Sequence, residues 1–260
     1  MKKQEKRAPF SVPLWKWVLL FAALLFCLYT LVRAILRRKV QEILMSLATM
    51  ALTAIPVLLE ARWGLAMSGG MYIFSLLYAL GPLLGTNLHF YFYVSWWDTL
   101  LHFAGGIVFA LLGCYLMVLL REDCRQMILV RGLFALCFSM AAAAAWEFCE
   151  YGCDRIFGMD SQQDTYLPSI TSYELSPEVG ETGTMVNITK VEINGVDMGW
   201  DGYLDIGLID TMEDMMAESA GALVYALAFV ADNGRHPAFR RRERVNRRKI
   251  WNEGQKNPTI

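Results

Sequence analysis

Apolar residues are gathered along this chain into six long runs, at about residues 14–32, 43–60, 71–92, 97–120, 128–152 and 206–231. These lengths are close to the ~20 residues that a helix needs to cross a hydrocarbon core of roughly 30 Å. Lipid offers no hydrogen-bond partner to a backbone amide, so each run is expected to be helical. The pattern predicts an all-α protein, a polytopic transmembrane bundle of about six spans.

A polar loop, residues 158–205, separates the last two spans, and we expect it to be extracytoplasmic. Within it, residues 183–199 alternate β-branched with polar side chains and contain Asn194-Gly195. Asn-Gly is a preferred pair for the type I′ turn of a β-hairpin. We expect a small two-stranded hairpin there, inside one helical domain of residues 1–235 that is followed by a basic tail, residues 236–260.

The composition agrees with a membrane location. Of the 260 residues, 55% are hydrophobic and 19% are charged, and the mean hydropathy is +0.34. Such a chain is too apolar for an ordinary soluble domain. The counts of 20 Gly, 8 Pro and 6 Cys exclude collagen-like, disordered and disulfide-scaffold proteins.

The net charge of −1 conceals a strong separation of charge along the chain. Residues 235–260 contain nine Lys or Arg and two acids, whereas residues 154–214 contain thirteen acids and two bases. The bias of basic residues toward the cytoplasm places the C-terminal tail inside and the acidic loop outside a bacterial inner membrane. The same rule does not decide the orientation of the first two spans. Six spans would place the basic residues between positions 33 and 39 on the outer side, where the rule disfavours them.

The basic tail also indicates a partner. Clustered Lys and Arg beside a membrane attract anionic lipid headgroups, so we expect the tail to contact anionic lipid in addition to the bilayer itself. No nucleic-acid partner is expected, since the basic stretch is not accompanied by a domain that would bind one.

Ionisable residues inside spanning helices are costly and usually mark function. The last three spans contain several at one end, spaced so that they share helix faces. They are Asp98 and His102, then Glu147 and Glu150, then Asp210, Asp214 and Glu218. Because these three helix ends are predicted on the same side, the sequence predicts an outward-facing pocket of carboxylates around one imidazole.

So many carboxylates cannot all stay ionised together in a site of low dielectric constant unless a cation neutralises them. We interpret the pocket as a divalent metal site, with Mg²⁺, Mn²⁺ or Ca²⁺ favoured and Fe²⁺ or Zn²⁺ suitable if the histidine binds. The predicted ligands are Asp98, His102, Glu147, Asp210 and Asp214, and Glu150 or Glu218 would be the catalytic base. A metal-bound water would then hydrolyse a lipid or another envelope substrate.

Two other classes of function stay open at this stage. In an ion-coupled or proton-coupled transporter the same side chains would pass ions inward, although acids would then be expected across the whole membrane depth. In a non-catalytic scaffold or sensor they would form a structural polar network, and the loop and tail would contact partners. Whether the protein is an enzyme is not decided by the sequence.

Three segments carry a resemblance to a known family. They are WWDTLLHFAGG (96–106), WEFCEYGCD (146–154) and DTMEDMMAESAGA (210–222). Together they resemble the YjdF-like family of uncharacterised bacterial inner-membrane proteins, over roughly residues 70–230. The resemblance implies that the family's characteristic polar positions are Asp98, His102, Glu147, Glu150, Asp210 and Asp214, and it implies no reaction. The chain departs from the family pattern in the long loop that follows SQQD (161–164).

Overall fold

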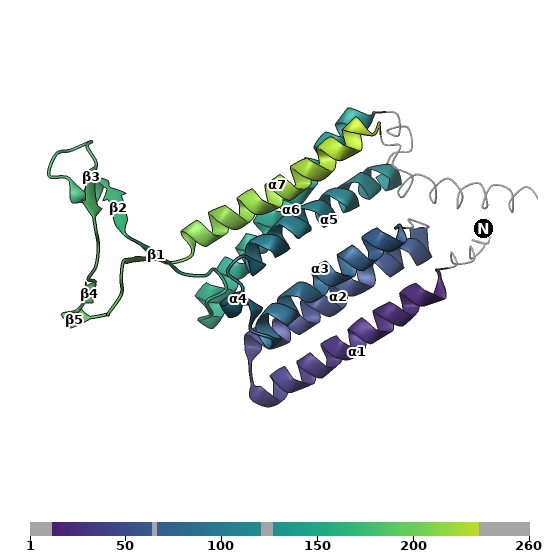
Figure 1. Ribbon diagram of the computed structural model, residues 1–260, viewed down its shortest axis with the longest axis horizontal. Helices are drawn as coiled ribbons and strands as arrows, with labels where there is room; N and C mark the ends of the chain where they lie inside the picture. The colour runs from purple at the N-terminus through teal and green to yellow at the C-terminus, as the bar shows by residue number, and fades with distance from the viewer. Residues whose placement is uncertain (1–11, 64–66, 121–126, 234–260) are drawn as a thin grey trace, which may run out of the picture. The chain divides into compact units, whose positions relative to one another are not determined.

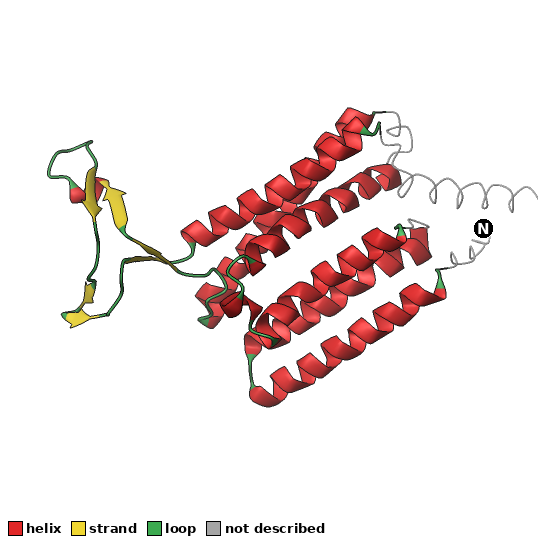
Figure 2. Ribbon diagram, in the orientation of Figure 1, coloured by secondary structure: helices red, strands yellow, loops and turns green. Residues whose placement is uncertain are grey.

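The computed structural model describes residues 12–63, 67–120 and 127–233, so the predicted tail, residues 236–260, lies outside the described residues. The described chain is dominated by long helices (Figure 2). They are α1 (Leu14–Arg37), α2 (Val40–Trp63), α3 (Gly69–Asn87), α5 (Trp97–Leu120), α6 (Ile128–Phe157) and α7 (Leu208–Ala231), with a short α4 (Phe90–Tyr93) before α5. Six of these helices are long and apolar enough to cross a membrane, which confirms the predicted all-α polytopic class.

The chain divides into two compact units, and the division falls within α6 and α7. One unit comprises Met1–Met140 with Ala217–Ile260, and the other comprises Ala141–Met216. The first holds α1 to α5 with the beginning of α6 and most of α7. The second holds the remainder of those two helices and the loop that joins them.

In the first unit, α1, α2 and α3 run alongside one another (Figure 1). The turn from α1 to α2 is tight, because Arg38 adopts a left-handed conformation and Lys39 N–H bonds to the Ala34 carbonyl at 3.0 Å. The core between these helices and α5 includes Leu20, Val57 and Tyr72. The basic residues near 33–39 therefore stand at a short helical hairpin, and the first two apolar runs are separate spans.

A buried ion pair ties the first three helices together. Lys16 of α1 is 1% exposed and bonds to the carboxylate of Glu60 of α2, and its Nζ also donates to the Met67 carbonyl at 2.9 Å. The Tyr72 hydroxyl of α3 donates to the Lys16 carbonyl at 2.8 Å. Neither charged residue was among the predicted site residues, because each is a single charge in a segment whose other residues are mostly apolar.

Close helix approach in the first unit depends on small residues. Ala110, Ala135 and Ala222 bring α5, α6 and α7 into one apolar cluster. A Cβ at Gly106 would lie 2.0 Å from the Glu218 carbonyl oxygen, and one at Gly221 would lie 2.0 Å from the Phe103 carbonyl oxygen. The α5 and α7 backbones are therefore in direct contact, as small residues permit in membrane helices.

The loop of the second unit forms three short antiparallel strand pairs. Strand β1 (Thr165–Leu167) pairs with β6 (Tyr203–Asp205), β2 (Ser169–Ser172) with β3 (Gly183–Val186), and β4 (Glu192–Ile193) with β5 (Val196–Asp197). The hairpin at Asn194-Gly195 is confirmed, and both turn residues have the positive φ that a type I′ turn requires (53° and 80°).

The alternation over residues 183–199 predicted a longer hairpin than the one that forms. Residues 183–186 pair back with β2, with Thr171 opposite Thr184 and their hydroxyl oxygens 2.9 Å apart. A local alternation shows that a segment is suited to a strand, but the cross-strand partner decides which strand it joins.

Candidate functional site

The candidate site begins with two side chains of α5. Asp98 and His102 are one helical turn apart, which puts both on the same face. The Oδ1 atom of Asp98 lies 3.8 Å from Nε2 of His102. The histidine side chain is 10% exposed and the aspartate side chain 22% exposed. This separation is too long for a direct hydrogen bond between the two atoms.

A carboxylate of α7 approaches the other nitrogen of the same ring. The Oε2 atom of Glu218 lies 4.0 Å from Nδ1 of His102, and the Glu218 side chain is 4% exposed. The backbone contacts at Gly106 and Gly221 place Glu218 at this level, because they fix α7 directly against α5. His102 is therefore flanked by two acids, one toward each ring nitrogen.

Helix α6 adds a hydroxyl group to the cluster. Ser139 is fully buried, and its Oγ lies 3.3 Å from Oε1 of Glu218 and 3.1 Å from the Gly106 carbonyl oxygen. The serine was not predicted as a site residue. There was little indication of its role in the sequence, because a serine close to the alanines of residues 141–145 is typical of a helix face that packs against another helix.

Asp214 precedes Glu218 by one turn of α7 and is 3% exposed. Helices α5 and α7 run in the same direction, since His102 lies beside Glu218 and Gly106 beside Ala222. Asp98 and His102 each offer one ligand atom to a possible metal ion, and so does Asp214, which belongs to the second unit.

The remaining predicted residues lie in the second unit, as Asp214 does. Glu147 is 3% exposed and lies beside Thr211 and Asp210. Asp210 accepts a hydrogen bond from Gln163 N–H at 2.9 Å, and Glu150 accepts one from Trp146 Nε1 at 2.8 Å. The two bonds join Asp210 to the loop and Glu150 to its own helix.

The loop is also anchored at the end of α6. Asp154 accepts hydrogen bonds from the backbone N–H groups of Ser161 at 2.6 Å and Gln162 at 3.0 Å. The Gln162 side chain bonds to the Thr211 hydroxyl at the start of α7. Asp154 therefore fixes the path of the chain where it leaves the helix, which is a structural role.

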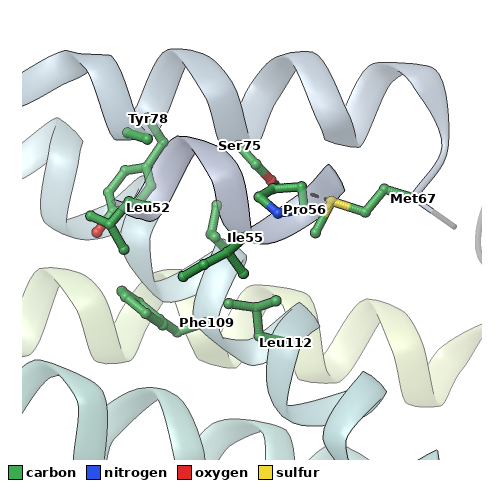
Figure 3. A pocket seen from close by; sticks show the side chains of 10 residues that line it. Leu52, Ile55, Pro56, Met67, Ser75, Tyr78, Phe109 and Leu112 are labelled. Atoms are coloured by element: carbon green, nitrogen blue, oxygen red, sulfur yellow. Dashed lines mark hydrogen bonds between the residues drawn. The ribbon is translucent and has the colours of Figure 1, made fainter. Parts of the chain in front are cut away.

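An apolar cavity lies within the first unit (Figure 3). It is lined by side chains of α2, α3 and α5, among them Ile55, Tyr78 and Phe109. The Tyr78 and Phe109 rings meet edge to face, with centroids 6.2 Å apart. The Tyr78 hydroxyl lies against Gly105, where a Cβ would be 2.9 Å away, and Gly105 is three residues after His102. The cavity and the cluster therefore share one wall.

The fold and the cluster define a multi-pass membrane protein with carboxylates grouped around a buried histidine. A family model described as predicted membrane protein (DUF2238) matches residues 18–235, which is most of the chain. The chain belongs to this family, in agreement with the YjdF-like resemblance. Neither a curated protein nor a solved structure shows significant similarity to the chain.

Proposed function

We propose that the protein binds a divalent cation at Asp98 and His102 of α5, together with Asp214 of α7. The separation of 3.8 Å between Asp98 Oδ1 and His102 Nε2 is the observation that carries this proposal. It exceeds a hydrogen bond, yet a cation bonded to both atoms at about 2.1 Å can bridge roughly 3.0 to 4.2 Å. Glu147 and Asp210 are proposed as further ligands.

The chemistry of the donor set narrows the choice of ion. Carboxylate oxygens with a single imidazole suit Mn²⁺ or Mg²⁺, and they also accept Fe²⁺ or Zn²⁺. A cation would also offset the repulsion between neighbouring carboxylates. Asp214 and Glu218 are each 3% exposed and lie on one face of α7. Two adjacent buried carboxylates are unfavourable when both are ionised and no cation is near.

The proposed activity is hydrolysis of a lipid or another envelope substrate at the outer membrane face. A bound cation lowers the pKa of a coordinated water and so supplies a nucleophile at neutral pH. Glu218, which lies 4.0 Å from His102 Nδ1, and Glu150 are proposed as the candidates for the catalytic base that would accept a proton from that water. The proposed orientation has the loop outside a bacterial inner membrane, with the basic tail inside and against anionic lipid.

Metal binding is tested by elemental analysis and Mn²⁺ titration of the protein purified in detergent. We expect about one ion per chain in the wild type, and a loss of at least tenfold in affinity in His102→Ala and in Asp98→Asn. Asp201→Asn is the matched control, since Asp201 is an exposed loop acid. Equal metal content in wild type and both site variants would refute the site.

Hydrolysis is tested in vesicles of phosphatidylglycerol and phosphatidylethanolamine that contain the protein. Mass spectrometry should show cleavage that needs added Mn²⁺ and is abolished in Asp98→Asn. Transport is the second candidate, and the buried Lys16–Glu60 pair favours it because it places a second ionisable pair inside the bundle. Uptake of Mn²⁺ into the vesicles without lipid cleavage would replace the hydrolase proposal by transport.

A further inference from the structure

Arg131 of the first unit is a buried cation in the first turn of α6, and it is only 7% exposed. Its Nε atom has no hydrogen-bond partner among the residues that the structure describes. The guanidinium lies over the Phe229 ring of α7, with Cζ 5.0 Å from the ring centroid. Its charge acts on the Cys114 thiol and the Tyr225 phenol, neither of which is a carboxylate. An aromatic ring offsets only part of the cost of burying such a charge.

The start of α6 adds a second source of positive potential at the same place. The helix begins at Ile128, and Arg131 N–H bonds to the Met127 carbonyl at 3.0 Å. The N–H groups that precede Arg131 in the first turn have no acceptor within the helix, and the helix dipole gives this end a partial positive charge. A cation is unfavourable at such an end, whereas a phosphate group is stabilised there. One anion would therefore offset both the guanidinium and the helix end.

The guanidinium lies at one end of the spanning region. Phe229, which it contacts, belongs to the last turn of α7, and α6 begins one turn before Arg131. A Cβ at Gly132 would lie 2.8 Å from Cγ2 of Val230, so these two helix ends pack against each other. The ends of spanning helices lie at the level of the lipid headgroups. Glu218 precedes Phe229 by roughly 16 Å along α7, so this place is separate from the candidate metal site.

The side chains beside Arg131 at the start of α6 are apolar and exposed. Met127 is 52%, Leu129 72% and Leu133 60% exposed. Leu129 and Leu133 are one helical turn apart and therefore share a face. Exposed apolar side chains next to a buried cation suit a ligand that carries both a phosphate group and acyl chains. This surrounding favours a membrane lipid over a free phosphate ion as the source of the anion.

We propose that Arg131 and the first turn of α6 bind the phosphate group of an anionic membrane lipid. A guanidinium offers parallel N–H donors that match two phosphate oxygens, and basic pockets between membrane helices bind such headgroups. Leu129 and Leu133 contact the acyl chains of the same lipid. The site does not depend on the proposed metal site, and it needs no particular orientation, because both leaflets contain phosphate.

Native mass spectrometry of the full chain in detergent tests the proposal. The probes are dioleoyl phosphatidylglycerol, dioleoylglycerol, which has the same acyl chains without phosphate, and inorganic phosphate. We expect the wild type to bind phosphatidylglycerol about tenfold more tightly than either of the others, because only this probe combines acyl chains with a charged acceptor. Arg131→Gln should weaken phosphatidylglycerol binding about tenfold and leave dioleoylglycerol binding unchanged. Lipid bound to the basic tail contributes equally to both proteins, so the difference between them reports on Arg131.

Arg155→Gln is the matched control, because Arg155 is exposed and lies in the last turn of the same helix. It removes the same charge and should change the affinity less than about twofold, as expected for an exposed charge. If Arg131→Gln fails to fold, Arg131→Lys takes its place. It should lose about threefold in affinity, since an ammonium group cannot form two parallel bonds to phosphate.

Three results would contradict the proposal. Equal affinity for phosphatidylglycerol in the wild type and in the folded Arg131 variant would remove Arg131 from the site. Dioleoylglycerol binding as tight as that of phosphatidylglycerol would show that the acyl chains suffice and that no phosphate site exists. Inorganic phosphate binding as tight as that of the lipid, and lost in Arg131→Gln, would assign the site to a free phosphate ion and overturn the lipid as its ligand.

Discussion

Gly106 of α5 packs directly on the backbone of Glu218 of α7, and a Cβ at this glycine would lie 2.0 Å from the Glu218 carbonyl oxygen. Neither partner can rotate away, because the contact is with backbone atoms. The smallest residue thus sets the distance between the two helices that carry the polar cluster. The position of Glu218 relative to His102 depends on that distance.

The first prediction concerns this contact. Gly106→Ala should destabilise the protein by about 1–3 kcal/mol, because the helices must separate to admit the methyl group. Thermal unfolding in detergent should show a lower midpoint. Gly152→Ala is the control, since a Cβ there meets nothing within 4 Å and alanine favours a helix over glycine. An unchanged midpoint in Gly106→Ala would show that the close helix contact is not formed.

The second prediction concerns the buried ion pair of α1 and α2. Lys16→Met should destabilise the protein by about 3–5 kcal/mol, because it leaves the Glu60 carboxylate buried without its cation. The double variant Lys16→Met with Glu60→Met should recover most of that loss, since two apolar side chains can replace a buried pair. Unfolding midpoints of the two single variants and the double variant measure the coupling. Purely additive effects would contradict the pairing.

The third prediction concerns pH and the acidic loop. Burial, followed by the charges of Asp164 and Asp154, raises the pKa of Asp160 above its usual value. The folded loop therefore binds the proton more tightly than the unfolded chain does. The resulting stabilisation is complete below the unfolded pKa of about 3.9 and is lost as the pH rises through the higher folded value.

Asp160→Asn should accordingly protect the loop at pH 7 relative to the wild type, and the difference should disappear below pH of about 3.9. Amide hydrogen exchange of residues 159–175, compared between pH 3 and pH 7, measures this. Asp201→Asn, at an exposed loop position, is the control. Faster exchange in Asp160→Asn at neutral pH would show that the charge stabilises the loop.

The fourth prediction concerns orientation in the membrane. Val179 lies in the loop between α6 and α7 and is fully exposed, so a cysteine placed there can react without disturbing the fold. In a cysteine-free background, Val179→Cys should react with a membrane-impermeant maleimide in intact cells. A cysteine added after Ile260 should react only after permeabilisation. The reverse pattern would place the acidic loop in the cytoplasm and remove an outer-face site.

Local properties of the sequence were sufficient for the spans and for part of the site. A span is predicted from the length of its apolar run. In lipid the backbone groups must bond within the segment, and a helix satisfies them. The pairing of Asp98 with His102 follows from helical periodicity within α5. The turn at Asn194-Gly195 was also predicted from local sequence, because a type I′ turn needs positive φ angles that favour those two residue types.

Tertiary structure decided which helix faces meet, and sequence spacing does not contain that information. Ser139 gave no distinct signal, and it became part of the cluster because α6 brings it to Glu218. The charges of Lys16 and Glu60 are 44 residues apart along the chain and pair only because α1 packs on α2. The sequence alone determined the membrane class and predicted which carboxylate and imidazole side chains could bind a cation. The contacts between helices decided how those residues are grouped, because packing of small residues sets the distances between their backbones.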